Sequence, residues 1–273
     1  MATTSTSGSA YRYDHFRLSH LLADMRFDPD TPTTGDRLPQ LDLDTLDGGR
    51  ITFEDLDRPH LFVFGSNTCP MTASAGDVLG ARHHEFGDKI RFVLVQVREA
   101  HPGEHLPQPS SMEEKRAHAR RLRDTLNVDF TVAIDDFDGS FHSSLDPKPN
   151  AAYLVDRHGR ILFRSMWASD EPGLRTALTA TIEGRTAARR QSTRVLQPTL
   201  GALGHVGPVI DDAGPRARRD LLRSAPPMLL AARLTAQFRR VSPNRRGRAL
   251  LATAGATLLA VTLLAAVAIT LLR

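Results

Sequence analysis

The sequence of 273 residues contains a single cysteine, Cys69. One cysteine excludes a disulfide bond within the chain, and it excludes the paired cysteines of a Cys-x-x-Cys redox motif. Any disulfide that Cys69 forms must therefore involve a second molecule. The eleven histidines show no grouping with the spacing of a zinc site, so we expect no metal and no other cofactor.

Basic residues are outnumbered in the first two thirds of the chain. Residues 1–182 carry 20 basic and 27 acidic side chains, a net charge of −7, whereas residues 183–248 carry 14 arginines and 4 acidic residues, a net charge of +10. The main domain is therefore acidic, and the positive charge belongs to a tail. This distribution argues against a nucleic-acid partner for the main domain.

Only one long stretch of the sequence lacks charge. Residues 249–272 are uncharged and follow an arginine-rich segment, 239–248. The length of this run predicts a transmembrane helix, and the arginines before it predict that the preceding domain lies in the cytoplasm. We thus expect a single-pass C-terminal membrane anchor. Residues 1–10 are rich in serine and threonine and lack the apolar segment of a signal peptide.

The remaining patterns predict an α/β domain. We expect an N-terminal arm over 1–34, a domain over 35–186, a basic segment interrupted by proline and glycine over 187–248, and the membrane helix over 249–272. Within the domain, the order βαβαβ, hairpin, helix predicts a central mixed sheet with helices on both faces. The basic segment is either a flexible linker or, near residues 220–240, a helix lying on a membrane surface.

Cys69 lies where a buried strand is expected to pass into a helix. Four apolar residues, 61–64, precede the helix-breaking run Gly65-Ser66-Asn67, and Pro70 suits the first turn of a helix. At such a helix N-terminus, free N–H groups and the helix dipole favour a thiolate. The alternative is a buried cysteine that acts as a small apolar residue. The combined pattern favours a redox-active Cys69 with a lowered pKa.

Three segments of the sequence resemble the iodothyronine deiodinases. They are Phe64-Gly65-Ser66-Asn67-Thr68-Cys69-Pro70, the run Val97-Arg98-Glu99-Ala100-His101-Pro102, and the run from Pro149 to Ile161. The resemblance spans about residues 35–185 and implies a thioredoxin-like fold. Cysteine replaces the family's selenocysteine, and Pro109 stands where the family has a second histidine. The family is usually anchored at its N-terminus.

The resemblance implies a catalytic set and a supporting set of residues. Cys69 takes the position of the nucleophile, and Glu99 and His101 match the acidic and histidine residues near it. Two residues apart on a strand, these two would share a face, and a carboxylate beside His101 would favour the imidazolium that stabilises a thiolate. Pro149 matches the proline loop that faces the nucleophile, and we expect a cis peptide bond there. Ser66, Thr68 and Pro70 complete the supporting set.

These inferences predict a membrane-anchored thiol oxidoreductase. Because the chain has no second cysteine, an external thiol, of the thioredoxin or glutathione kind, must resolve any adduct on Cys69. A peroxiredoxin-like peroxide reductase is one alternative, although the Pro-x-x-x-Thr-x-x-Cys motif of that family is not met. A non-catalytic, membrane-tethered adaptor with a redoxin fold is another. The sequence also leaves a homodimer open.

Overall fold

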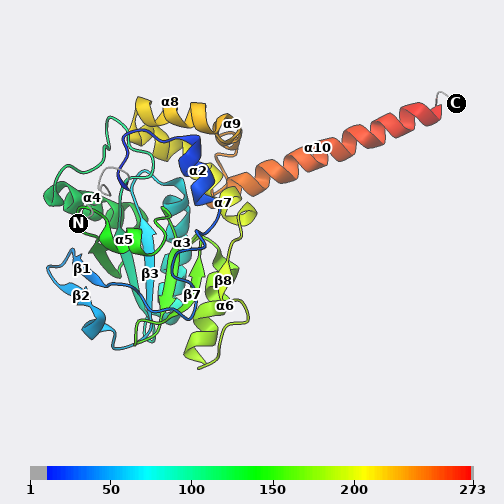
Figure 1. Ribbon diagram of the computed structural model, residues 1–273. Coiled ribbons are helices and arrows are strands. Elements are labelled where there is room, and N and C mark those ends of the chain that lie inside the picture. Colours follow the sequence, from blue (N-terminus) through cyan, green and yellow to red (C-terminus); the bar gives the residue numbers. More distant parts are fainter. Residues whose placement is uncertain (1–10, 272–273) are drawn as a thin grey trace.

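A computed structural model describes residues 11–271 of the chain (Figure 1). Its centre is a sheet of eight strands in the order β2-β1-β5-β4-β3-β6-β7-β8. In chain order the strands are β1 (Asp42–Thr45), β2 (Arg50–Thr52), β3 (His60–Gly65), β4 (Arg91–Gln96), β5 (Thr131–Ile134), β6 (Ala152–Val155), β7 (Ile161–Ser165) and β8 (Gln191–Ser192).

The sheet is mixed, as the sequence predicted. β3, β4 and β5 run parallel, whereas β6 pairs antiparallel with β3 and β7 pairs antiparallel with β6. β1 and β2 form a hairpin at one edge of the sheet and pair antiparallel, with Leu43 opposite Ile51. Every residue of the central strand β3 is buried, because helices cover both faces of the sheet.

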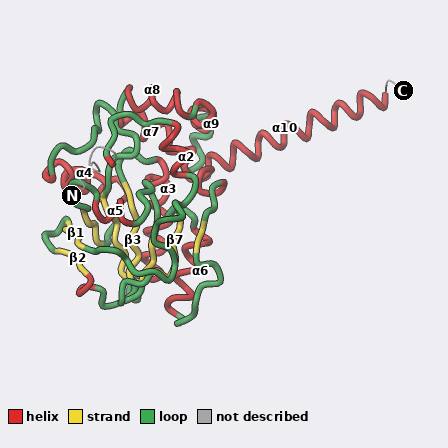
Figure 2. Tube along the Cα trace, in the orientation of Figure 1, coloured by secondary structure: helices red, strands yellow, loops and turns green. Residues whose placement is uncertain are grey.

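Ten helices accompany the sheet in the described part of the chain (Figure 2). They are α2 (Leu18–Asp24), the 3-10 helix η1 (Phe53–Asp55), α3 (Pro70–Phe86), α4 (Met112–Leu126), α5 (Ser140–Ser144), α6 (Glu171–Ile182), α7 (Leu196–Ala213), α8 (Pro215–Ser224), α9 (Pro226–Thr235) and α10 (Pro243–Leu271).

Alternation along β3 divides the core into two layers. Leu61 and Val63 pack in a cluster with residues of α3, α4 and α6, whereas Phe62 and Phe64 pack in a second cluster that contains Phe141 of α5. Side chains on a strand point alternately to opposite faces, so a run of four apolar residues serves both layers. This buried strand fixes the position of the turn that carries Cys69.

The basic segment differs from the predicted linker. Residues 196–235 fold into α7, α8 and α9, which share a small apolar core centred on Val206, Ile210 and Leu221. Two of the glycines in this segment serve close packing. A Cβ atom on Gly204 would lie 2.2 Å from the carbonyl oxygen of Pro243, and one on Gly247 would lie 2.2 Å from that of Leu200. These glycines let α7 and α10 approach closely.

The prediction of a membrane anchor is wrong. Over the residues that the structure describes, no helix combines the length and the apolar character needed to cross a membrane. Residues 249–271 of the uncharged run lie in α10, which begins among arginines and contacts α7 and α9. The prediction was based on the uncharged length of residues 249–272. The last two residues of the chain and the serine- and threonine-rich residues 1–10 lie outside the described range.

Candidate functional site

Cys69 is the N-cap residue of α3, directly after the turn that ends β3. The strand ends at Gly65, the amide of Cys69 donates to the carbonyl oxygen of Ser66, and Pro70 occupies the first turn of the helix. The location at a helix N-terminus is therefore as the sequence predicted. Only 2% of Cys69 is exposed, so the thiol faces the protein interior in this conformation.

Burial reverses the expected effect on the Cys69 thiol. Removal from water raises the pKa of Cys69 to about 11, because a thiolate is poorly solvated in an apolar environment. Hydrogen bonding to Thr72 and to the Met71 amide lowers the pKa, as expected for a helix N-terminus, but this effect is smaller. The prediction of a lowered pKa neglected the helices that cover the thiol.

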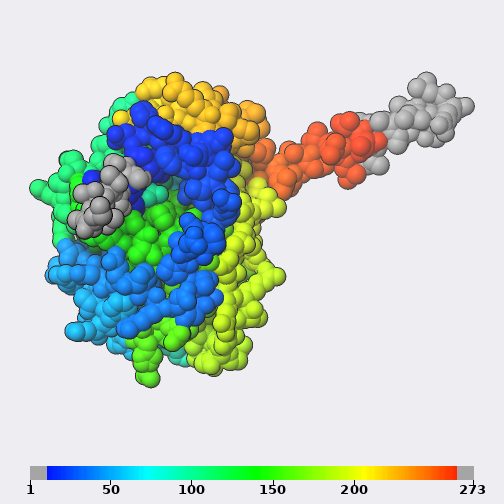
Figure 3. Space-filling model, viewed as in Figure 1, coloured from blue at the N-terminus to red at the C-terminus, as the bar shows by residue number. Residues whose placement is uncertain are grey.

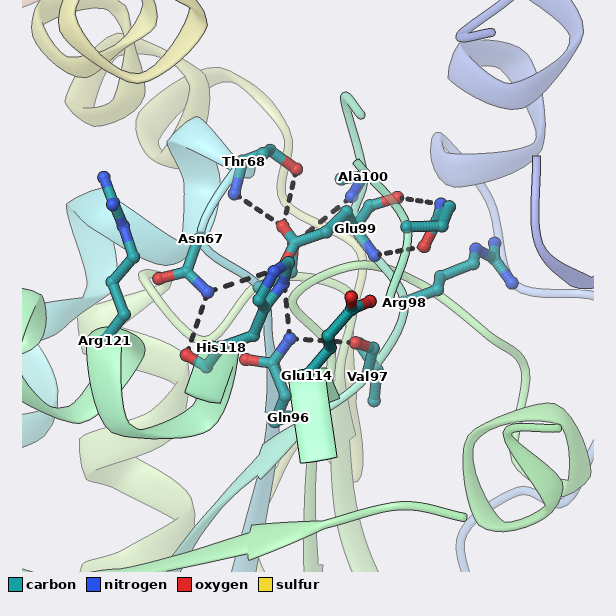
Figure 4. Close-up of polar contacts among 12 residues, drawn as sticks. Asn67, Thr68, Gln96, Val97, Arg98, Glu99, Ala100, Glu114, His118 and Arg121 are labelled. Carbon is teal, nitrogen blue, oxygen red and sulfur yellow. Dashed lines mark hydrogen bonds and ion pairs between the residues drawn. The ribbon is translucent and has the colours of Figure 1, made fainter. Parts of the chain in front are cut away.

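Glu99 is fully buried and organises the turn before Cys69 rather than the thiol itself (Figure 4). Its Oε2 accepts hydrogen bonds from the Thr68 amide at 2.9 Å and from the Thr68 hydroxyl at 2.8 Å. Its Oε1 lies 2.8 Å from Nδ1 of His118, on α4. Gln96 and Asn67 donate longer bonds to the same oxygen. Glu99 thus links the turn before Cys69 to the end of β4 and to α4.

His101 does not pair with Glu99, contrary to the expectation from their spacing. The His101 amide donates to the Thr68 hydroxyl at 3.0 Å, while the imidazole packs against the ring of Phe16 with centroids 4.1 Å apart. Its buried Nδ1 has no hydrogen-bond partner among residues 11–271. Burial lowers the pKa of His101 to about 4, so the ring is neutral at physiological pH. It cannot supply the positive charge that was expected to stabilise a thiolate.

The supporting residues connect the Cys69 turn to two neighbouring loops. Ser66 Oγ accepts from the Ala100 amide at 3.3 Å, and the Thr72 hydroxyl donates to the carbonyl oxygen of Pro149 at 3.4 Å. Pro149 thus reaches the first turn of α3. The expected cis peptide bond before it is absent, because all peptide bonds in the described chain are trans.

Cys69, His101 and Pro149 line one cavity of about 50 Å³. The N-terminal arm and the helices α7, α8 and α9 close it from outside. Figure 3 shows the arm, in blue, next to the gold surface of α8 and α9. The lining residues are mostly apolar: Phe16, Leu21, Asp24, Met25, Cys69, Pro70, Met71, His101, Pro149, Trp167, Thr199, Ala202, Leu203, Val206, Leu221 and Met228.

Three polar residues near the site were not found from the sequence. Asp24 reaches the cavity from α2, Trp167 reaches it from the segment after β7, and His118 contacts Glu99 from α4. The indole N–H of Trp167 is buried and unpartnered within the described residues. His118 lies 19 positions from Glu99, and no local spacing relates either residue to the motif around Cys69. Within residues 11–271, no three His, Cys, Asp or Glu side chains are arranged to hold a metal ion.

Comparisons with known proteins point to the fold. No family model and no curated protein matches the sequence. Among solved structures, an uncharacterized conserved protein from Geobacillus kaustophilus is similar, with 19% identity, 60% of this chain and 89% of that chain covered, and a TM-score of 0.50. A thioredoxin-like protein from Aeropyrum pernix follows, with 14% identity, 52% and 89% covered, and a TM-score of 0.43.

A secreted disulfide oxidoreductase from Mycobacterium tuberculosis, homologous to E. coli DsbE, shares 17% identity with a TM-score of 0.41, over 52% of this chain and 96% of that one. The β3-α3-β4 unit, followed by the β6-β7 hairpin and α6, is the arrangement of the thioredoxin fold. The chain has a thioredoxin-like fold. The resemblance to iodothyronine deiodinases rests on the sequence segments alone.

Proposed function

We propose that the protein is a thiol oxidoreductase in which Cys69 reduces a small, largely apolar substrate. The main support is the position of the only cysteine: it is at the N-terminus of α3, in an enclosed cavity with His101 and Pro149. A cavity lined by apolar side chains with a few polar groups is typical of a small-molecule site. The unpartnered N–H of Trp167 and Nδ1 of His101 offer hydrogen bonds to a polar group on such a substrate.

The resemblance to deiodinases favours reductive removal of halogen from an aromatic ring. In the first step the S–H and C–X bonds break, hydrogen takes the place of the halogen on carbon, and a sulfenyl halide forms on Cys69. An external thiol displaces halide to give a mixed disulfide, and a second thiol releases Cys69 as the free thiol. The sum converts the aryl halide and two thiols into the arene, one disulfide and the hydrogen halide. Thiol exchange with an organic disulfide would use the same sulfur and the same reductant.

Turnover of three probe substrates tests this proposal. The full chain is incubated with excess dithiothreitol and either an iodophenol or cumene hydroperoxide. In a separate single-turnover reaction without dithiothreitol, it is mixed with a dipyridyl disulfide. We expect dehalogenation or disulfide exchange that Cys69→Ser abolishes, while Ser74→Ala, a second variant on α3, keeps the activity. Selective turnover of the hydroperoxide would instead support the peroxiredoxin-like alternative.

A non-catalytic binding module is the second candidate, and the raised pKa of Cys69 favours it. A thiol that is buried among mostly apolar side chains is usually inert. If this candidate is correct, none of the three probes turns over, and Cys69→Ser binds an apolar ligand as well as the unmodified protein does. The absence of turnover together with unchanged ligand binding would contradict the oxidoreductase proposal.

A further inference from the structure

Asp24 presents a carboxylate to the cavity that contains Cys69. It is the last residue of α2 and the only acidic residue among the described residues that line this cavity. Within residues 11–271 its side chain makes no hydrogen bond or ion pair, and the residue is partly buried. An unpaired carboxylate that lines the same cavity as the thiol is placed to exchange a proton there.

The backbone beside Asp24 is held firmly over the site. Lys148 Nζ donates to the carbonyl oxygen of Ala23 at 2.9 Å, and the amide of Asp28 donates to Asp146 Oδ2 at 2.8 Å. Lys148 and Asp146 also form a buried ion pair of 2.6 Å. The end of α2 is thus attached to the loop that precedes Pro149. α2 also lies beside α8 (Figure 1). Asp24 is therefore positioned by contacts on both sides.

The other titratable groups near the thiol are not suited to proton transfer. The carboxylate of Glu99 is occupied by Thr68 and His118, and the imidazole of His101 is too weakly basic because burial lowers its pKa to about 4. Burial raises the pKa of Asp24 to about 7, which is the range in which a general base is most effective at neutral pH.

The groups that act on Asp24 come from several elements. Arg98 and Lys148 favour its charged form, and Asp146 opposes it. Asp24 in turn raises the pKa of Tyr13, on the arm, and of Cys69. The charge of Asp24 is therefore felt at the sulfur, and as a mere charge it would hinder thiolate formation.

We propose that Asp24 is the proton-transfer residue for Cys69, an inference that rests on the proposed oxidoreductase function. As Sγ attacks one sulfur of a disulfide, the thiol proton passes to the Asp24 carboxylate and the S–S bond breaks. The leaving thiolate then takes this proton from Asp24. The net change is one thiol and one disulfide converted into a mixed disulfide on Cys69 and one released thiol. Concerted transfer avoids a free thiolate in the apolar cavity.

The direction in which Asp24→Asn changes the reaction rate distinguishes proton transfer from a simple charge effect. The full chain reacts in a single turnover with 4,4′-dithiodipyridine, and thiol release is followed from about pH 5 to about pH 9. We expect the rate to rise through neutral pH as Asp24 ionises. Asp24→Asn should remove this titration, leaving only the increase that comes from ionisation of the thiol itself, and should slow the reaction by about 100-fold near neutral pH. A carboxylate that acted only as a charge would give the opposite result, a faster reaction in Asp24→Asn.

Two further variants make the experiment decisive. Asp24→Glu should retain the rise through neutral pH, and Asp30→Asn, an exposed residue of the same arm, should react like the unmodified protein. Unfolding temperatures establish that each variant is folded. If the unmodified protein reacts and Asp24→Asn is not slowed, this inference is wrong while the proposed function stands. If the unmodified protein releases no thiol at any pH, both are wrong.

Discussion

Glu99 accepts both the backbone N–H and the hydroxyl of Thr68, the residue immediately before Cys69. The carboxylate is fully buried, and its second oxygen lies 2.8 Å from His118 Nδ1. The acidic residue of the motif therefore acts on Cys69 through the backbone that positions it. This relationship makes Glu99 a positioning residue.

Glu99→Gln should destabilise the protein by about 2–4 kcal/mol, because the amide group cannot accept all the hydrogen bonds that the carboxylate receives. Urea unfolding followed by circular dichroism measures this loss. Glu113→Gln on α4, an exposed position, is the matched control and should unfold like the unmodified protein. Equal midpoints for the two variants would contradict the role assigned to Glu99.

The Cys69 thiol should remain protonated at pH 8, because burial raises its pKa to about 11. Ultraviolet absorbance of the thiolate, with Cys69→Ser as the blank, gives the ionised fraction. We expect no thiolate signal below about pH 9. Titration at or below the ordinary thiol pKa of about 8.5 would show that the closed cavity is not the main form in solution.

The packing of Leu221 should control access to Cys69. Leu221 is 1% exposed, lines the cavity and belongs to the shared core of α7, α8 and α9. Leu221→Ala should weaken this core by about 2 kcal/mol or more. The fraction of molecules in which α7–α9 have opened away from the Cys69 cavity should then increase about 30-fold. The rate of Cys69 alkylation by iodoacetamide reports this change. Leu222→Ala, at a neighbouring position that is 52% exposed, should leave the rate unchanged. An equal rate in both variants would argue for access by another route.

Asp24→Asn should stabilise the protein more at pH 8 than at pH 4. The pKa of Asp24 is raised from 3.8 to about 7, so the folded state binds the proton more tightly than the unfolded state does. Stability is then greatest below the unfolded pKa and falls as the pH rises toward the folded pKa. Asp24→Asn does not lose stability in this way. The free energy of unfolding that the unmodified protein loses amounts to at most about 4 kcal/mol. Free energies of unfolding in urea at the two pH values measure the difference.

His101→Phe should show the opposite pH trend. The pKa of His101 is lowered from 6.5 to about 4, so the unfolded state binds the proton more tightly and stability is lost as the pH falls through this window. The phenylalanine variant keeps its stability there. We expect its unfolding temperature, relative to the unmodified protein, to be higher at pH 5 than at pH 8. A difference that does not vary with pH would show that His101 is solvated in the folded state.

Within residues 35–186, local patterns in the sequence were sufficient to predict the order βαβαβ, hairpin, helix and the place of Cys69. The run 61–64 specified a buried strand, because its side chains must serve both faces of the sheet, and Pro70 marked the start of α3. The sequence also singled out Glu99 and His101 as residues near the cysteine. It could not decide what they do there, because their partners Thr68, His118 and Phe16 are brought to them by the fold.

Tertiary structure alone decided the environment of the thiol. Asp24, His101 and Trp167 come from distant segments and meet at Cys69 only because the arm and the helices α7–α9 close over the end of α3. The same closure removes water from the sulfur, and desolvation outweighs the hydrogen bonds of the helix N-terminus. A helix N-terminus is a local feature that a sequence reveals, whereas burial depends on which remote residues pack against it. For this reason the sequence located the cysteine correctly and predicted its pKa shift with the wrong sign.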